Sequence, residues 1–132
     1  MRLHHVQLAI PAGGEDAARE FWIGGAGWSE VPKPPALTGR GGCWFRRLDA
    51  EGRVLAEIHC GVEADFRPAA KAHPALLLDS VKELEALGAR LPLHGGAVDW
   101  SERHTFDGYE RFHASDPFGN RIEVLAVPEA TA

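Results

Sequence analysis

Two histidines and two glutamates recur at matched spacing in this chain of 132 residues. His5 precedes Glu57 by 52 positions, and His73 precedes Glu123 by 50 positions. Imidazole nitrogens and carboxylate oxygens together suit divalent ions such as Zn, Ni, Mn, Co or Fe. Such groups projecting into one concave surface would be costly to bury unless a cation bound them. The doubled spacing therefore predicts one metal site, His5, Glu57, His73 and Glu123, shared between two similar segments.

One position in this set is ambiguous. Glu57 and His59 are two residues apart on a predicted strand, so their side chains face the same side. The spacing favours Glu57 as the ligand, because 52 positions match the second segment better than 54 do. The alternative is that His59 binds the metal and that Glu57 is hydrogen-bonded to His59 and orients its ring.

The two halves share one order of elements, which is a strand, a helix and then three strands. Ser80 and Glu83 form a capping box that starts the second helix. The predicted elements of the first half are strands 3–10, 28–31, 43–48 and 53–60 with a helix over 15–23. Those of the second half are strands 74–78, 109–114 and 121–127, a helix from 81, and at most one short strand in the weakly patterned stretch 92–108.

We expect a single domain over 1–132, with module one at about 1–62, a linker at about 61–72 and module two at about 73–127. Each half has too few residues to bury a core alone. The predicted fold is therefore α+β, with two paired βαβββ modules forming a cupped mixed sheet and the helices on its outer face.

The composition and charge of the chain argue against two kinds of partner, nucleic acids and membranes. The formal net charge is -5 and 45% of residues are hydrophobic, which is typical of a globular protein without a basic surface. We therefore expect no nucleic-acid partner. No apolar run approaches the roughly 20 residues of a membrane span, and the N-terminus lacks signal-peptide features, so we expect a cytoplasmic protein with no membrane partner. Cys43 and Cys60 are expected to be free, packed thiols.

The segment Asp116-Pro117-Phe118-Gly119-Asn120-Arg121-Ile122-Glu123 combines a tight turn with a strand that carries a carboxylate. Together with the repeat, it resembles the vicinal oxygen chelate superfamily, which includes glyoxalase I, bleomycin-resistance proteins, fosfomycin-resistance enzymes and extradiol dioxygenases. The resemblance covers about 3–127 and implies a glyoxalase-like domain. It implies a divalent metal held by His5, Glu57, His73 and Glu123, and a homodimer in which modules of two chains complete each site.

The first functional hypothesis is a glyoxalase-like, metal-dependent lyase or isomerase acting on a small oxygenated substrate. The metal would chelate two substrate oxygens, and Glu57 or Glu123 would act as the catalytic base. A second hypothesis is a metal-free protein of the bleomycin-resistance type that binds a small molecule. A third is an extradiol-type Fe(II) dioxygenase with three ligands. No counterpart of a glutathione-binding basic cluster is evident.

Further side chains are candidates for contacting a substrate, as an aromatic wall or as partners of an anionic group. They are Trp44, Arg46, His59, Arg67, Tyr109 and Arg111. The stretch 99–106 is long and mixes Trp100 with charges, so it is a candidate lid. Four other histidines have no predicted metal role: His4, His94, His104 and His113.

Overall fold

The computed structural model describes residues 1–130, so the last two residues of the predicted domain lie outside the described part. Module one contains four strands, one α-helix and a π-helical turn. Its elements are β1 (Val6–Ile10), α1 (Glu15–Arg19), the π-helical Glu20–Gly25, β2 (Ser29–Val31), a 3-10 helix at Pro35–Arg40, β3 (Cys43–Leu48) and β4 (Val54–Val62). The strand order is β1-β4-β3-β2, with β1 parallel to β4 and the other pairs antiparallel.

Module two repeats this plan. Its elements are β5 (Ala75–Leu78), α2 (Val81–Arg90), a 3-10 turn at Leu91–His94, β6 (Ala97–Asp99), β7 (Glu110–Ser115) and β8 (Arg121–Ala126). The order β5-β8-β7-β6 matches that of module one, and β5 is parallel to β8. The predicted α+β fold of two βαβββ modules is confirmed.

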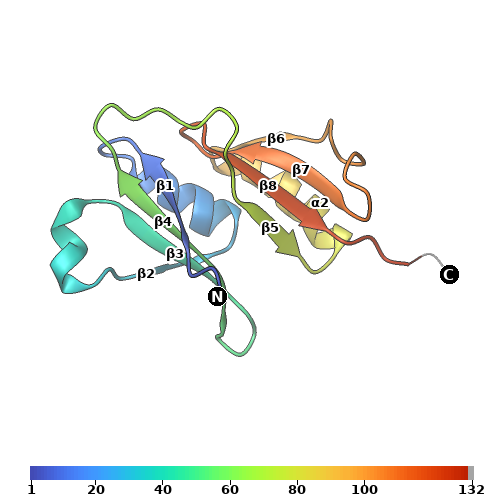
Figure 1. Cartoon of the computed structure of the whole chain (residues 1–132), viewed down its shortest axis with the longest axis horizontal. Helices are drawn as coiled ribbons and strands as arrows, with labels where there is room; N and C mark the ends of the chain where they lie inside the picture. The colour runs from blue at the N-terminus through green and yellow to red at the C-terminus, as the bar shows by residue number, and fades with distance from the viewer. Residues whose placement is uncertain (131–132) are drawn as a thin grey trace.

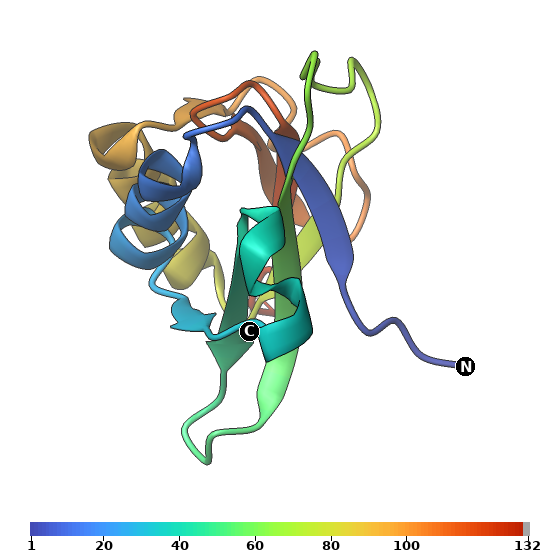
Figure 2. The ribbon, with the colours of Figure 1, turned by 90° about the vertical axis from the view of Figure 1, so that its left-hand side faces the viewer.

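The two sheets lie side by side, and the helices of both modules form a layer behind them (Figures 1 and 2). A single core joins the layers: Phe21 and Trp22 of module one belong to the same buried cluster as Leu84 and Phe112 of module two. Since this core covers only the helix side of each sheet, the other face of each sheet is left open. None of the described helices is both long and apolar enough to cross a membrane.

The first helix differs from its prediction. The sequence predicts one helix over 15–23. In the structure the regular α-helix ends at Arg19, and the chain continues as a wider π-helical turn. The backbone N–H of Ala26 donates to the Phe21 carbonyl at 2.9 Å, which is an i to i+5 bond. In this geometry both Phe21 and Trp22 are 1% exposed. Alternation of apolar residues in the sequence cannot show such a change of helical pitch.

Polar bonds join the modules at one end of the sheets. The side-chain amide of Asn120, in the turn between β7 and β8, donates to the Ala9 carbonyl at the end of β1 (2.8 Å). His94 and Glu20, one from each module, approach to 2.6 Å. The capping box of α2 differs from the usual one in its second bond. The Ser80 hydroxyl accepts from the backbone N–H of Glu83, but the Glu83 carboxylate accepts from the backbone N–H of Asp79 rather than of Ser80.

Candidate functional site

Strand alternation places the predicted site residues on the open faces of the sheets. In module one, Phe45 and Ile58 point into the shared core, so Glu57, which neighbours Ile58, points away from it. In module two, Ile122 and Val124 point into the core, so Glu123 between them points to the open face. Each module thus carries one cluster, which we call half-site 1 (His5, Trp44, Arg46, Glu57, His59) and half-site 2 (His73, Arg111, His113, Glu123).

In half-site 1, the Glu57 carboxylate is bonded through both of its oxygens. Arg46 Nε donates to Oε1 at 2.5 Å, and His59 Nε2 approaches Oε2 at 2.5 Å. Arg46 lies opposite Glu57 in the register of β3 and β4, so strand pairing itself positions this ion pair. Because charge-assisted hydrogen bonds are the stronger kind, the carboxylate is firmly held.

An aromatic stack supports this arrangement. The His59 ring lies between His5, at 3.9 Å between centroids, and Trp44, at 3.8 Å. Burial lowers the pKa of His59, and its bond to Glu57 offsets part of that effect. Burial opposes ionisation of Glu57, but the bonds from His59 and Arg46 outweigh it and lower the pKa of the carboxyl. The ionised carboxylate beside a neutral imidazole is therefore the favoured state near neutral pH.

In half-site 2, three side chains approach the Glu123 carboxylate at Oε1. His73 Nε2 lies 3.1 Å away, Arg111 Nη1 3.4 Å and His113 Nε2 3.6 Å. His73 Nδ1 lies 2.7 Å from the Lys71 carbonyl oxygen, so this nitrogen is the donor of that bond. Glu123 itself is 5% exposed. The half-site thus presents two imidazoles and one buried carboxylate.

The four predicted metal ligands are brought together only in pairs. Among the described residues, the groups of atoms close enough to share an ion are His4, His5 and Glu57 in module one, and His73, His113 and Glu123 in module two. Neither group combines the modules. Within one chain the predicted set therefore forms two separate half-sites, and a single four-residue site stays a prediction.

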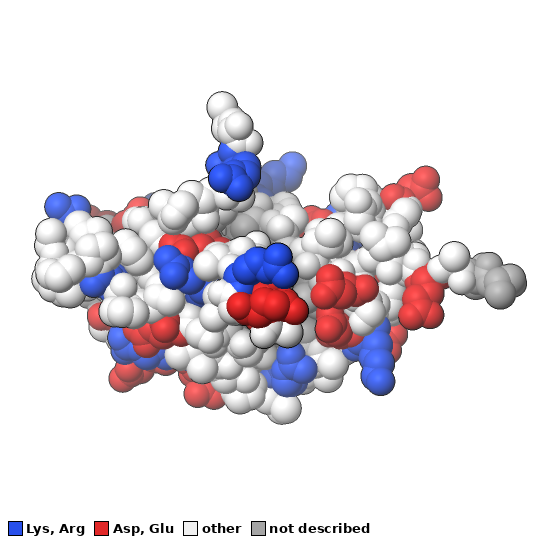
Figure 3. All heavy atoms as spheres, turned by 90° about the horizontal axis from the view of Figure 1, so that it is seen from below, with Lys and Arg blue, Asp and Glu red and all other residues white. Residues whose placement is uncertain are grey.

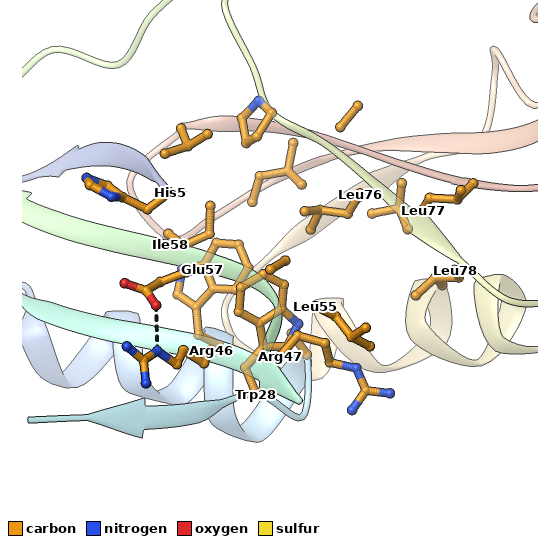
Figure 4. A pocket seen from close by; sticks show the side chains of 18 of the residues that line it. His5, Trp28, Arg46, Arg47, Leu55, Glu57, Ile58, Leu76, Leu77 and Leu78 are labelled. Carbon is orange, nitrogen blue, oxygen red and sulfur yellow. Dashed lines mark hydrogen bonds and ion pairs between the residues drawn. The ribbon is translucent and has the colours of Figure 1, made fainter. Parts of the chain in front are cut away.

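A cleft of about 1310 Å³ lies between the modules and is lined by residues from β1, β4, β5 and α2. His5, Arg46 and Glu57 lie at its edge, and the dashed line in Figure 4 marks the bond between the last two. The rest of the wall is mainly apolar and includes Leu55 and Leu77, which are 61% and 64% exposed. Half-site 1 therefore opens toward an apolar cleft, whereas half-site 2 is not part of its lining.

The predicted substrate-contacting residues divide between several places. Trp44, Arg46 and His59 belong to half-site 1, and Arg111 to half-site 2. Tyr109 packs edge-on against Phe106 at 4.8 Å, beside Arg111, whose guanidinium lies over the same Phe106 ring. Arg67 is exposed on the linker between the modules.

The structure adds detail to two of these expectations. One face of Trp44 is already covered by His59, so only its other face is open to a ligand. The stretch predicted as a lid packs onto the protein instead, because Trp100 lies against Phe112 at 5.0 Å and Arg103 bonds to Glu110 at 2.7 Å.

His113 is the site residue that the sequence analysis missed. It lies directly opposite Glu123 in the register of β7 and β8. The signal that could have found it is the short turn at Asp116–Asn120, because a tight hairpin pairs residues at nearly equal distances from its centre. Counting back from that turn brings His113 and Glu123 together.

The side chains of half-site 2 fit a divalent metal. Two ligands of one ion with bonds of about 2.0–2.2 Å lie about 3.0–3.5 Å apart, which is close to the separations of Glu123 Oε1 from His73 (3.1 Å) and His113 (3.6 Å). The hydrogen bond from His73 Nδ1 to a carbonyl is a common way to orient a metal-binding histidine. In half-site 1, by contrast, both oxygens of the Glu57 carboxylate already have close partners, Arg46 and His59, at 2.5 Å.

The charged surface is mixed. On the face seen in Figure 3, acidic and basic side chains of the described residues are interspersed without a continuous basic patch. The N-terminal residues project from the body on the side of the open sheet faces (Figure 2).

Two paired βαβββ modules with histidines and glutamates on their open faces define the class of α+β fold to which this protein belongs. A comparison with known families gives the particular one: the Glyoxalase/Bleomycin resistance protein/Dioxygenase superfamily matches over residues 2–124. The chain belongs to this superfamily. A comparison with curated proteins finds no match.

Solved structures agree with this assignment. A glyoxalase family protein from Bacillus anthracis is 39% identical with a TM-score of 0.77, covering 96% of this chain and 99% of that one. The fosfomycin resistance protein FosX from Listeria monocytogenes has a TM-score of 0.67 at 12% identity, covering 100% and 95%. TnmS3, an antibiotic binding protein from Streptomyces sp. CB03234, has 0.63 at 22%, covering 96% and 98%. The last two share the fold alone.

Proposed function

We propose that this protein is a glyoxalase-like, metal-dependent enzyme of the lyase or isomerase type, acting on a small substrate with two neighbouring oxygens. The observation that carries the proposal is half-site 2, where two imidazoles and a buried carboxylate converge within the reach of one ion. The candidate ligands are those predicted from the sequence, His5, Glu57, His73 and Glu123, with His73 and Glu123 the better supported pair. The candidate metals are Zn, Ni, Mn, Co and Fe.

The functional unit in this proposal is a homodimer. Half-sites 1 and 2 lie apart within one chain, so a second copy is needed to place half-site 1 of one chain opposite half-site 2 of the other. Apolar side chains at the cleft and on the N-terminal arm are exposed, with Leu3 83%, Val54 49% and Leu77 64% exposed. Exposed apolar surface of this kind is typical of a subunit contact.

In such a dimer the two half-sites would have different tasks. A divalent metal at half-site 2 would supply Lewis-acid polarisation of the substrate oxygens. Glu57 is ionised, faces the open side and lies at the edge of the cleft, so it is the candidate base for a proton on the adjacent carbon. Arg46 and His59 hold its carboxylate in place.

Acetohydroxamate, a small chelator with two neighbouring oxygens, tests the proposal directly. Protein stripped with a chelating resin is reloaded with Co(II), and binding of acetohydroxamate is followed by visible absorbance. We expect one ion per chain and a spectral change on addition of the chelator. Wild-type protein that takes up no ion from Zn, Ni, Mn, Co or Fe(II) would exclude the enzyme in this form. Sedimentation velocity should show a dimer that Leu77→Lys dissociates.

The apolar cleft supports a second candidate function, a metal-free binding protein of the bleomycin-resistance type. In this alternative the cleft holds an apolar or planar molecule, with Arg46 at its edge. An extradiol-type Fe(II) dioxygenase is the third possibility, and it would use three ligands. Metal content separates the binding protein from the enzymes, and consumption of oxygen with a catechol separates the dioxygenase from the lyase.

A further inference from the structure

The residue that faces the site carboxylate across the sheet differs between the modules. Glu57 on β4 is paired with Arg46 on β3, whereas Glu123 on β8 is paired with His113 on β7. The two positions correspond in the βαβββ repeat. A guanidinium cannot bind a metal, but an imidazole can. The two carboxylates, which looked equivalent in the sequence, are therefore in different chemical environments.

From this difference we infer that the metal is held by module two alone, through His73, His113 and Glu123, and that Glu57 is not a ligand. The inference rests on the proposed function and identifies the ligands of its metal. It adds His113, to which the sequence analysis gave no metal role, and removes Glu57 and His5.

The geometry of half-site 2 suits three ligands on one side of an ion. The ligand atoms of His73, His113 and Glu123 lie within 4.8 Å of one another. Two imidazoles and one carboxylate on one face leave further coordination positions open, as in sites where a metal binds substrate or water. These positions would face away from the core, toward the region where a partner chain would dock.

The geometry of half-site 1 opposes a metal. An ion at Glu57 would have to displace Arg46 and His59, each 2.5 Å from a carboxylate oxygen, or lie beside the guanidinium. Like charges at such short separations repel, and a divalent ion is repelled by a guanidinium twice as strongly as a monovalent ion is. The neighbouring His4 and His5 are exposed, and their Nδ1 atoms lie 2.9 Å apart, so these two rings already contact each other.

Half-site 2 also contains an arginine, but it is bound differently. Arg111 Nη1 is 3.4 Å from Glu123, whereas its other nitrogens bond to the Thr105 hydroxyl at 2.8 Å and the Glu102 carbonyl at 3.2 Å. The guanidinium also lies over the Phe106 ring, 5.4 Å from its centroid. These contacts hold Arg111 to the 102–106 segment, so an ion can bind Glu123 without first breaking a short ion pair.

Titration of the stripped protein with Co(II) and Zn(II) tests the inference, with calorimetry for affinity and stoichiometry. We expect one site per chain. His113→Ala should weaken binding at least about 10–100-fold, the range found when a histidine's supporting partner is lost. The matched variant Glu57→Gln, which removes the corresponding carboxylate charge of module one, should stay within about threefold of wild type. Circular dichroism and thermal unfolding check the fold, and His113→Gln replaces His113→Ala if the latter fails to fold.

The outcomes separate the two proposals. Wild-type protein that binds no ion overturns the metal-dependent function and the inference together. Wild-type protein that binds one ion, with His113→Ala and His113→Gln unaffected, overturns only the inference. Loss of binding in Glu57→Gln to the same extent as in His113→Ala also overturns it, and restores the four-residue set.

Discussion

The two modules place a buried glutamate at corresponding positions of β4 and β8, yet the groups that surround its carboxylate differ. In module one, Arg46 and His59 contact Glu57 at 2.5 Å, and the pKa of the carboxyl is lowered by bonds within the protein. In module two, the contacts of Glu123 are longer, from 3.1 to 3.6 Å, and two of them come from imidazoles. A repeated fold can thus keep a carboxylate in both halves while surrounding it with different partners at different distances.

This comparison bears on how the site residues divide their tasks. A carboxylate fixed by an arginine keeps its position and charge without a metal, which suits a base or a polar contact to substrate. A carboxylate that lies beside two imidazoles and a more distant guanidinium can still be approached by a cation from solution. The pairing partner across the sheet, rather than the glutamate itself, therefore distinguishes the halves.

The largest effect is expected from exchanging that partner in module two. His113→Arg should place a guanidinium opposite Glu123 and remove one imidazole from half-site 2. Loss of a ligand and added positive charge act together, so Co(II) affinity should fall by more than about 100-fold, or about 2.7 kcal/mol. Calorimetric titration of the stripped variant gives the value. Retained wild-type affinity would show that His113 is not part of the metal site.

The reverse exchange should produce a smaller gain. Arg46→His removes the guanidinium from Glu57 and offers an imidazole in its place, so half-site 1 acquires the arrangement of half-site 2. We expect a second, weaker Co(II) equivalent per chain, because His59 still engages Glu57. Arg46→Gln, which removes the charge without adding a strong ligand, is the control and should stay at one equivalent. A single equivalent in both variants would mean that the arginine is not what excludes the ion.

Much of this architecture could be predicted from the sequence, because its signals are local. Alternation of apolar residues located seven of the eight strands among the described residues, and the Asp116–Asn120 turn correctly marked where β8 begins. The same turn shows buried Asp116 accepting from the N–H groups of Phe118 and Asn120. The direction of Glu57 and Glu123 also follows from alternation, since each neighbours a core residue on its strand and points away from the core.

The partners across the strands could not be predicted, because they depend on register. The register of β3 and β4 shifts between Arg47 and Leu48. Extending the pairing of Leu48 with Val54 without that shift would place Arg46 opposite Ala56 instead of Glu57, on the other face. Whether the half-sites meet within a chain or between chains depends likewise on how the modules pack, which no local pattern encodes.

The smallest effect concerns the stability of the metal-free protein. Glu57→Gln keeps the shape of the side chain but removes the charge that Arg46 and His59 bind. A hydrogen bond to a charged group contributes about 1.5–3 kcal/mol, and the Arg46 side chain is 37% exposed, so screening reduces this to about 1–2 kcal/mol. Glu123→Gln, with its longer contacts, should cost less than about 1 kcal/mol. Urea unfolding at pH 7 with chelator present compares the two variants.

The stabilisation contributed by Glu57 should depend on pH, and its lowered pKa gives the direction of that dependence. The pKa of Glu57 is lowered in the folded protein, so the unfolded chain binds a proton there first as the solution is acidified. The stabilisation from Glu57 is therefore complete above the ordinary glutamate pKa of about 4.3 and is lost as pH falls through the lower, folded value. The gap in unfolding free energy between wild type and Glu57→Gln should narrow below about pH 4. A constant gap down to pH 3, or an equal loss in Glu123→Gln, would show that the two carboxylates are held alike after all.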